Sequence, residues 1–197
     1  MPPKMKFTRE EVIAAALEIV REGGMAALTA RSLASALGCS AKPVFGLFEN
    51  MQQVQEAVVR AADAEYQSFL AEGMSSGRYP PYKASGMAYI GFARRSPELF
   101  KLLFMRGRSA AEQTQSGDDS IDGIISLISR STGLSTEDAR LFHLEMWIFV
   151  HGIASMIVTG YLDWQEDYVS RVLSDAYEGL RARWCGGEKC TRYKLWD

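Results

Sequence analysis

The fold is decided near the front of the chain by Leu28-Thr29-Ala30-Arg31-Ser32-Leu33-Ala34, by Leu37-Gly38-Cys39-Ser40 and by Val44-Phe45-Gly46-Leu47-Phe48. Thr29 is a residue that caps the free amides of a helix start, and Gly38 is a residue that ends a helix. Ser40 can cap a further helix, and Pro43 then falls inside its first turn, where a missing N–H costs little. Two short helices joined by a glycine turn predict a helix-turn-helix over about 29–48.

Capping signals also bound the helices on either side of this motif. Thr8 with Glu11 forms a capping box that opens a helix, which the glycine pair 23–24 ends. Asn50 with Gln53 forms a second box, which opens a long helix after the motif. The front end is therefore predicted to be a three-helix unit followed directly by a long helix.

Helical periodicity continues to the end of the chain, and no alternating pattern typical of strands appears. Clusters of glycine, serine, proline and polar residues predict loops over about 73–81 and 106–117. Further helices are predicted at about 83–95, 97–105, 119–131, 135–160 and 165–184. The predicted class is all-α, with about nine helices in an N-terminal helix-turn-helix domain and a C-terminal helical domain.

Composition limits the kind of protein this can be. The chain has 197 residues, is 47% apolar and carries a formal net charge of −2, which excludes wholesale disorder and a uniformly basic protein. The first 60 residues carry +1, from seven Lys and Arg against six Glu, so charge alone does not predict DNA binding. Three cysteines and a charged start without an apolar stretch predict a protein of the reducing cytosol. The apolar run 146–158 is too short for a membrane span and predicts a buried helix.

The three quoted pieces, together with Val54, resemble the DNA-binding domain of TetR-type transcriptional regulators over about residues 7–55. The resemblance implies that the second and third helices dock on double-stranded DNA. The residues it implicates in DNA contact are Thr29 and Arg31 at phosphate, Ser40, Ala41 and Lys42 in the groove, and Phe45 at the backbone. A solvated surface charge remains the alternative for Arg31, and a core aromatic remains the alternative for Phe45.

The sequence departs from the family pattern where phosphate contacts are usual. The family usually carries Tyr where Phe45 stands, often His where Leu47 stands, and Lys where Met51 stands. Glu49 adds a negative charge nearby. Fewer phosphate contacts mean weaker affinity and a shallower salt dependence, so we expect a weak DNA binder for this family.

The second half resembles a TetR-type C-terminal domain through Tyr89-Ile90-Gly91-Phe92-Ala93, Pro97-Glu98-Leu99-Phe100 and Trp147-Ile148-Phe149-Val150-His151-Gly152. The resemblance implies a domain over 56–184 that binds a small effector and forms a homodimer through its last two helices, with 185–197 as a flexible tail. The residues that could line a ligand pocket are Tyr66, Phe69, Met87, Phe104, Met105, Trp147 and His151. Each of them is also an ordinary core residue for a helical protein, and His151 fits a satisfied core histidine.

Catalytic and metal chemistry find little support. Gly73-Met74-Ser75-Ser76-Gly77 matches the nucleophile-elbow pattern, but that chemistry needs a strand before the serine and a helix after it. His143 and His151 are eight residues apart on one helix, with no Cys or acidic cluster beside them to complete a metal site. Cys185 and Cys190 could pair or bind metal with a partner, or be idle thiols. No motif for a cofactor appears, and we do not expect an enzyme.

These observations predict a cytoplasmic, sequence-specific DNA-binding transcriptional regulator. The resemblance implies a repressor that a small-molecule effector releases from its operator. The alternative is a helical ligand-binding protein whose DNA binding is weakened or lost, which fits the missing phosphate anchors.

Overall fold

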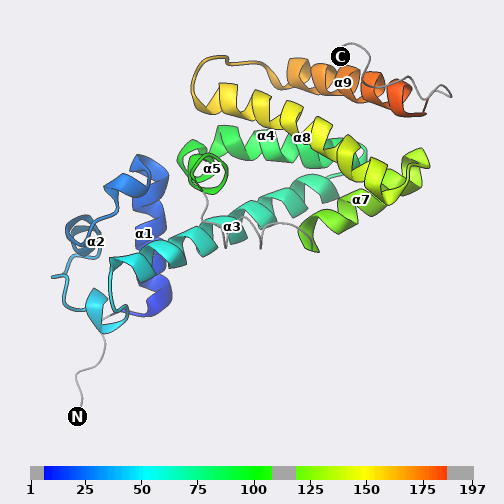
Figure 1. Ribbon diagram of the computed structural model, residues 1–197. Helices are drawn as coiled ribbons and strands as arrows, with labels where there is room; N and C mark the ends of the chain where they lie inside the picture. The colour runs from blue at the N-terminus through cyan, green and yellow to red at the C-terminus, as the bar shows by residue number, and fades with distance from the viewer. Residues whose placement is uncertain (1–6, 108–118, 186–197) are drawn as a thin grey trace, which may run out of the picture. The chain divides into compact units, whose positions relative to one another are not determined.

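The computed structural model describes residues 7–107 and 119–185, and every regular element in these ranges is helical (Figure 1). The α-helices are α1 (Arg9–Gly23), α2 (Ala30–Ala36), α3 (Met51–Ser75), α4 (Pro81–Arg95), α5 (Pro97–Phe104), α7 (Asp119–Thr132), α8 (Thr136–Val158) and α9 (Glu166–Cys185). Two short 3-10 turns, η1 (Met25–Ala27) and η2 (Val44–Gly46), lie between them. The predicted all-α class is confirmed.

The described residues form two compact units. One unit contains residues 7–71 and 92–107, and the other contains residues 72–91 and 119–185. The long helix α3 and the helix α4 each contribute residues to both units. The first unit holds all of the predicted helix-turn-helix.

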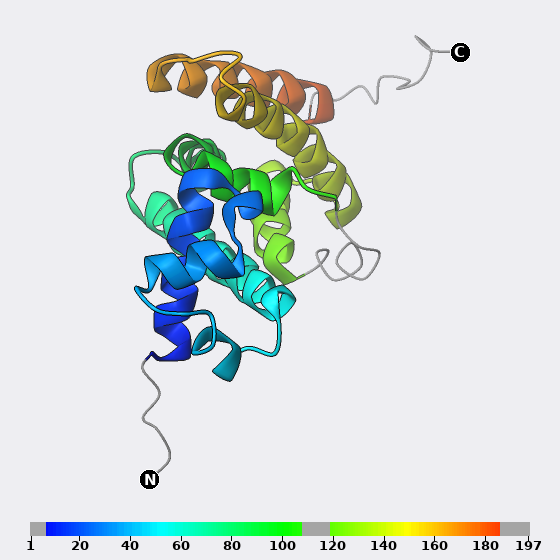
Figure 2. The same cartoon turned by 90° about the vertical axis from the view of Figure 1, so that its left-hand side faces the viewer.

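Local capping chemistry starts α1 as the sequence predicts. The Thr8 hydroxyl accepts the Glu11 amide at 3.2 Å, and the Glu11 carboxylate accepts the Thr8 amide at 2.8 Å. The buried face of α1 consists of Val12, Ala16 and Val20. In the first unit this helix packs against α2 and α5, and Figure 2 shows α1 and α2 crossing close together.

The prediction of a regular third helix in the motif is wrong. Residues 41–48 form a compact turn containing η2, in which the Val44 amide bonds the Ala41 carbonyl at 3.1 Å and the Phe48 amide bonds the Val44 carbonyl at 3.0 Å. Pro43 has no N–H to donate, and Gly46 is a poor helix former, so an α-helical ladder would have two weak points within these eight residues. The break before this turn lies at Gly38 as predicted, where φ is 61°.

The loop predicted from residue 73 begins later, because α3 continues to Ser75. Gly73 allows close helix packing at this point and does not end the helix. An added Cβ on Gly73 would lie 2.6 Å from the Cβ of Ala88 on α4, and both residues belong to the second unit. The absence of a side chain at Gly73 therefore lets these parts of α3 and α4 approach each other.

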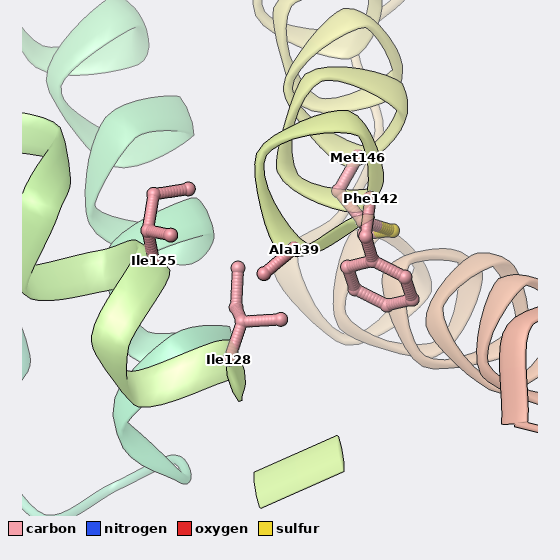
Figure 3. Packing of buried hydrophobic residues seen from close by; sticks show 5 residues of the cluster. All are labelled: Ile125, Ile128, Ala139, Phe142 and Met146. Atoms are coloured by element: carbon pink, nitrogen blue, oxygen red, sulfur yellow. The ribbon is translucent and has the colours of Figure 1, made fainter. Parts of the chain in front are cut away.

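The second unit is organised around α8. Its N-cap is Ser135, whose hydroxyl accepts the Asp138 amide at 3.1 Å. A cluster of buried side chains joins α7 to α8, namely Ile125, Ile128, Ala139, Phe142 and Met146 (Figure 3). Figure 1 shows α8 between α7 and α9. By length and composition α8 could cross a membrane, although a core helix of a globular protein passes the same test.

Candidate DNA-reading surface and ligand-contacting residues

The start of α2 presents two of the predicted DNA contacts. The Thr29 hydroxyl accepts the Ser32 amide at 3.0 Å, and the Ser32 hydroxyl accepts the Thr29 amide at 2.9 Å. This reciprocal bonding confirms Thr29 as the N-cap of α2. The side chains of Thr29 and Arg31 are exposed. An exposed helix start with a cation in its first turn is a suitable place for an anion such as phosphate.

The 41–48 turn separates buried from exposed side chains. Val44 and Phe48 are each only 1% exposed, whereas Phe45 is 43% exposed. The Ser40 and Lys42 side chains are exposed and Ala41 is half-buried. Val44 and Phe48 thus belong to the core of the first unit, while Lys42 and Phe45 project from it. The alternative of Phe45 as a core aromatic is wrong.

Arg9 is a residue at this surface that sequence reasoning missed. Its Nη1 donates to the Leu47 carbonyl at 2.9 Å, and its guanidinium carbon lies 4.1 Å from the centroid of the Phe48 ring. The two partners are 38 and 39 residues further along the chain. A charged residue in the first turn of a helix gives no local sign of such a contact, so only the fold reveals it.

Three of the pocket candidates cluster in the first unit. The Tyr66 ring meets the rings of Phe92 and Phe104 edge-on, with centroids 5.3 Å and 5.0 Å apart. Phe69 lies 5.8 Å from Phe92 by the same measure. Burial raises the pKa of the Tyr66 hydroxyl to about 12. The fourth candidate in this unit, Met105, is 42% exposed.

The other candidates lie in the second unit, on α4 and α8. Met87 is buried, and the Trp147 ring stacks on His151 with centroids 5.0 Å apart and 16° between the planes. The Tyr89 hydroxyl lies 2.8 Å from Nδ1 of His151, and burial lowers the pKa of this imidazole. A second pair repeats this arrangement, because the Tyr82 hydroxyl lies 3.1 Å from Nδ1 of His143. Both histidines thus have a tyrosine partner, a role that the sequence had not assigned to Tyr82 or Tyr89.

The remaining motifs are the candidate metal ligands, the nucleophile-elbow pattern at Ser75 and the cysteines. Within the described ranges, no group of three or more His, Cys, Asp or Glu side chains could hold a metal ion. Ser75 is at the end of α3, where its hydroxyl donates to the Glu72 carbonyl, and no strand precedes it. Cys39 is half-buried and forms no disulfide. Cys190 lies outside the described residues.

The comparisons with known proteins agree with one another. Residues 82–176 match the family described as "Tetracyclin repressor-like, C-terminal domain". An HTH-type transcriptional regulator of Mycobacterium tuberculosis is 26% identical over 162 residues, which cover 80% of this chain and 73% of the relative. A Rhodococcus sp. RHA1 structure described as a protein with unknown function has a TM-score of 0.72 at 21% identity, covering 92% of this chain and 100% of that one. A TetR-like transcriptional regulator from Rhodococcus sp. RHA1 has a TM-score of 0.64 at 16% identity, covering 93% and 100% of the two chains.

Proposed function

We propose that the chain is a TetR-type transcriptional regulator, which represses its target genes by binding an operator through residues 29–48 until a small molecule releases it. The reading head extends over residues 7–55, and the domain that binds the effector and forms the dimer extends over 56–184. The contact residues are Thr29, Arg31, Ser40, Ala41, Lys42 and Phe45.

The observation that carries this proposal is the division of side chains in the 41–48 turn. Val44 and Phe48 hold the turn in the core, so Lys42 and Phe45 are presented outward without contributing to the core themselves. Exposed Thr29 and Arg31 stand at the start of the preceding helix. A cation and an aromatic on a short turn, with a helix start beside them, suit a duplex in which phosphate contacts position the protein and groove contacts specify sequence.

The test is binding of the full chain to duplex DNA by fluorescence anisotropy over a range of salt concentrations. We expect binding to a random duplex that weakens with salt, and enrichment of one site when the chain selects from a random library. Lys42→Ala should weaken binding, and Arg60→Ala, at an exposed position of α3, is the matched control. If Lys42 contacts a guanine edge, the loss should be about 1–3 kcal/mol and confined to the selected site.

The opposite result supports the other candidate function. The turn is not a regular helix, and Phe45 and Met51 stand where phosphate anchors are usual. If the chain binds no duplex at low salt and selects no site, it is a ligand-binding relative that has lost DNA reading.

We further propose that the regulator acts as a homodimer through the exposed face of α8. This face carries large apolar side chains, with Leu144 at 48% and Ile148 at 59% exposed. Exposed apolar area of this kind marks an interface more often than a solvated surface. Trp147, Phe149 and Met156 add to the exposed apolar area of α8. A two-fold dimer reads two related half-sites, which suits a repressor.

Sedimentation at micromolar concentration should therefore give about twice the chain mass of 21.9 kDa. Ile148→Glu should shift the protein to the single-chain mass, because a carboxylate would be buried at the interface without a partner. Gln165→Glu adds the same charge at an exposed polar position and should leave the dimer intact. A single-chain mass for the wild type would rule out this interface.

For the effector we propose an apolar, ring-containing molecule that contacts the Tyr66 and Phe104 rings. The half-buried Tyr66 places one hydroxyl group among aromatic faces. Ligand sites typically combine such an apolar lining with a few polar groups. Compounds of this class should raise the thermal midpoint of the wild type. Tyr66→Phe should reduce that shift if the hydroxyl binds the ligand.

A further inference from the structure

We propose that Arg9 is a positioning residue for DNA reading, which fixes the 41–48 turn by holding its C-terminal end. This inference rests on the proposed function of the turn. Arg9 opens α1, and it contacts both the Leu47 carbonyl and the Phe48 ring. Two contacts of different kinds from one guanidinium fix both the backbone and a side chain of the same short segment.

The amides of the turn are bonded within it, but the carbonyl of Leu47 at its C-terminal end accepts its hydrogen bond from outside the turn. Its amides bond carbonyls three or four residues back, at Ala41, Pro43 and Val44. The chain then bends into α3, so the Leu47 carbonyl does not continue a helical ladder. Arg9 supplies a donor to that carbonyl at 2.9 Å. A hydrogen bond from a charged donor is stronger than one between neutral groups, and an exposed carbonyl here would otherwise be held only by water.

The start of α3, directly after the turn, adds hydrogen bonds at this same C-terminal end. The Glu49 amide donates to the Gln53 side chain at 3.1 Å, and the Gln53 amide donates to the Asn50 side chain at 3.0 Å. The turn is therefore bounded by the α3 cap after it, by Val44 and Phe48 beneath it, and by Arg9 at its C-terminal end. These three supports fix the positions of Lys42 and Phe45.

The placement of Arg9 within α1 also points to a tertiary role. A cation in the first turn of a helix is unfavourable toward the helix dipole, and Glu10 and Glu11 are the favourable residues there. Arg9 gains its favourable contacts across the fold, at the Leu47 carbonyl and over the Phe48 ring. An arginine over an aromatic face is stabilising by cation–π attraction.

The test compares Arg9→Met and Arg9→Lys with the wild type in the full-length chain. Methionine keeps an unbranched apolar stem but cannot donate to Leu47, whereas lysine can donate to the carbonyl and place a charge near the ring. Amide hydrogen exchange reports the turn directly, without DNA. In Arg9→Met we expect the Phe48 amide to exchange about tenfold faster, with the Gly24 amide at the end of α1 unchanged.

DNA binding then separates positioning from a direct phosphate contact. Arg9→Met should weaken binding to the selected site by about tenfold, with a smaller loss on random duplex and an unchanged salt slope. Arg9→Lys should recover part of the loss. Arg31→Met is the comparison variant for a phosphate contact and should lower the salt slope on all sequences.

Three results would overturn the proposal. Unchanged exchange at Phe48 would show that Arg9 does not hold the turn. A uniform loss of affinity with a shallower salt slope would make Arg9 a phosphate contact, and unchanged affinity for the selected site would remove it from DNA reading. If the wild type binds no DNA, the proposed function fails by itself, and the exchange result still decides whether Arg9 holds the turn.

Discussion

Arg21 and Glu65 form a two-pronged ion pair that joins α1 to α3 in the first unit. Nη2 of Arg21 lies 2.6 Å from one carboxylate oxygen of Glu65, and Nη1 lies 2.9 Å from the other. Nη1 also donates to the hydroxyl of Ser96 at 3.1 Å, and Ser96 occupies the N-cap position of α5 and is almost fully buried. One guanidinium therefore connects three helices, and the pair lowers the pKa of Glu65.

Glu65→Gln should destabilise the protein by about 1–2 kcal/mol, because a bidentate charged contact is replaced by a neutral one and the Arg21 charge loses its main partner. Glu18→Gln is the matched control, since Glu18 makes a single contact with Arg21 at 3.2 Å and is far more exposed. We expect the control to cost well under 1 kcal/mol. Urea unfolding of the two variants checks this, and equal losses would show that the two-pronged geometry adds nothing.

The two Tyr–His pairs predict a stability that falls as the solution becomes mildly acidic. Burial lowers the pKa of His143 and of His151, so the unfolded chain binds protons at a higher pH than the folded one. The stability from these neutral imidazoles is present above the unfolded pKa of about 6.5 and declines as pH falls below it toward the folded values. The Glu65 pKa is also lowered, but its stability is lost only at lower pH, below about 4.5.

Urea midpoints measured between about pH 8 and pH 5.5 report the titration of the histidines, because the carboxylates titrate at lower pH. The wild type should lose stability toward the acidic end. The double variant His143→Gln with His151→Gln should be flatter over the same range, because neither position then titrates. A wild-type midpoint that does not change with pH, or a decline that the double variant retains, would contradict this assignment.

The sequence predicted those features that depend on residues close together in the chain, such as the caps of the helices. The caps Thr8, Thr29 and Ser135 bond amides three residues away, so their roles can be read from spacing. The third helix of the motif does not follow from nearby residues in the same way. Spacing alone makes Pro43 compatible with a first helical turn, but together with Gly46 it leaves the segment without a regular helix.

Contacts between distant parts of the chain were the ones that sequence reasoning missed. Arg9 and Arg21 have the composition of surface charges, and their partners lie 38 and 44 residues away. No local pattern distinguishes a cation that crosses to another helix from one that stays in water. Lys42 and Arg31, in contrast, could be proposed as DNA contacts as soon as the helix-turn-helix motif was located in the sequence, and both are exposed.

Two helical glycines should respond to alanine in opposite directions. Gly73→Ala places a Cβ 2.6 Å from the Ala88 Cβ, so the helices must separate, and we expect a loss of about 1–2 kcal/mol. Gly123 is inside α7 with nothing within 4 Å of an added Cβ. Gly123→Ala should therefore stabilise by up to about 1 kcal/mol through helix propensity alone. Thermal unfolding of both variants checks the pair, and stabilisation by Gly73→Ala would mean that the packing there is loose.

The last prediction restores the phosphate anchors that this chain lacks. Phe45 is exposed, and Met51 is the first residue of α3, so a hydroxyl at one and an ammonium at the other can reach a docked backbone. Phe45→Tyr with Met51→Lys should tighten binding to every duplex and steepen the salt slope by about one unit, because one new charge meets one phosphate. The lysine opposes the α3 dipole, which should cost a few tenths of a kcal/mol of stability. Gln67→Lys adds the same charge about 24 Å further along α3 and should change the slope much less. If the double variant binds with the wild-type salt slope, this head does not dock on DNA as its relatives do, and the ligand-binding alternative gains the stronger support.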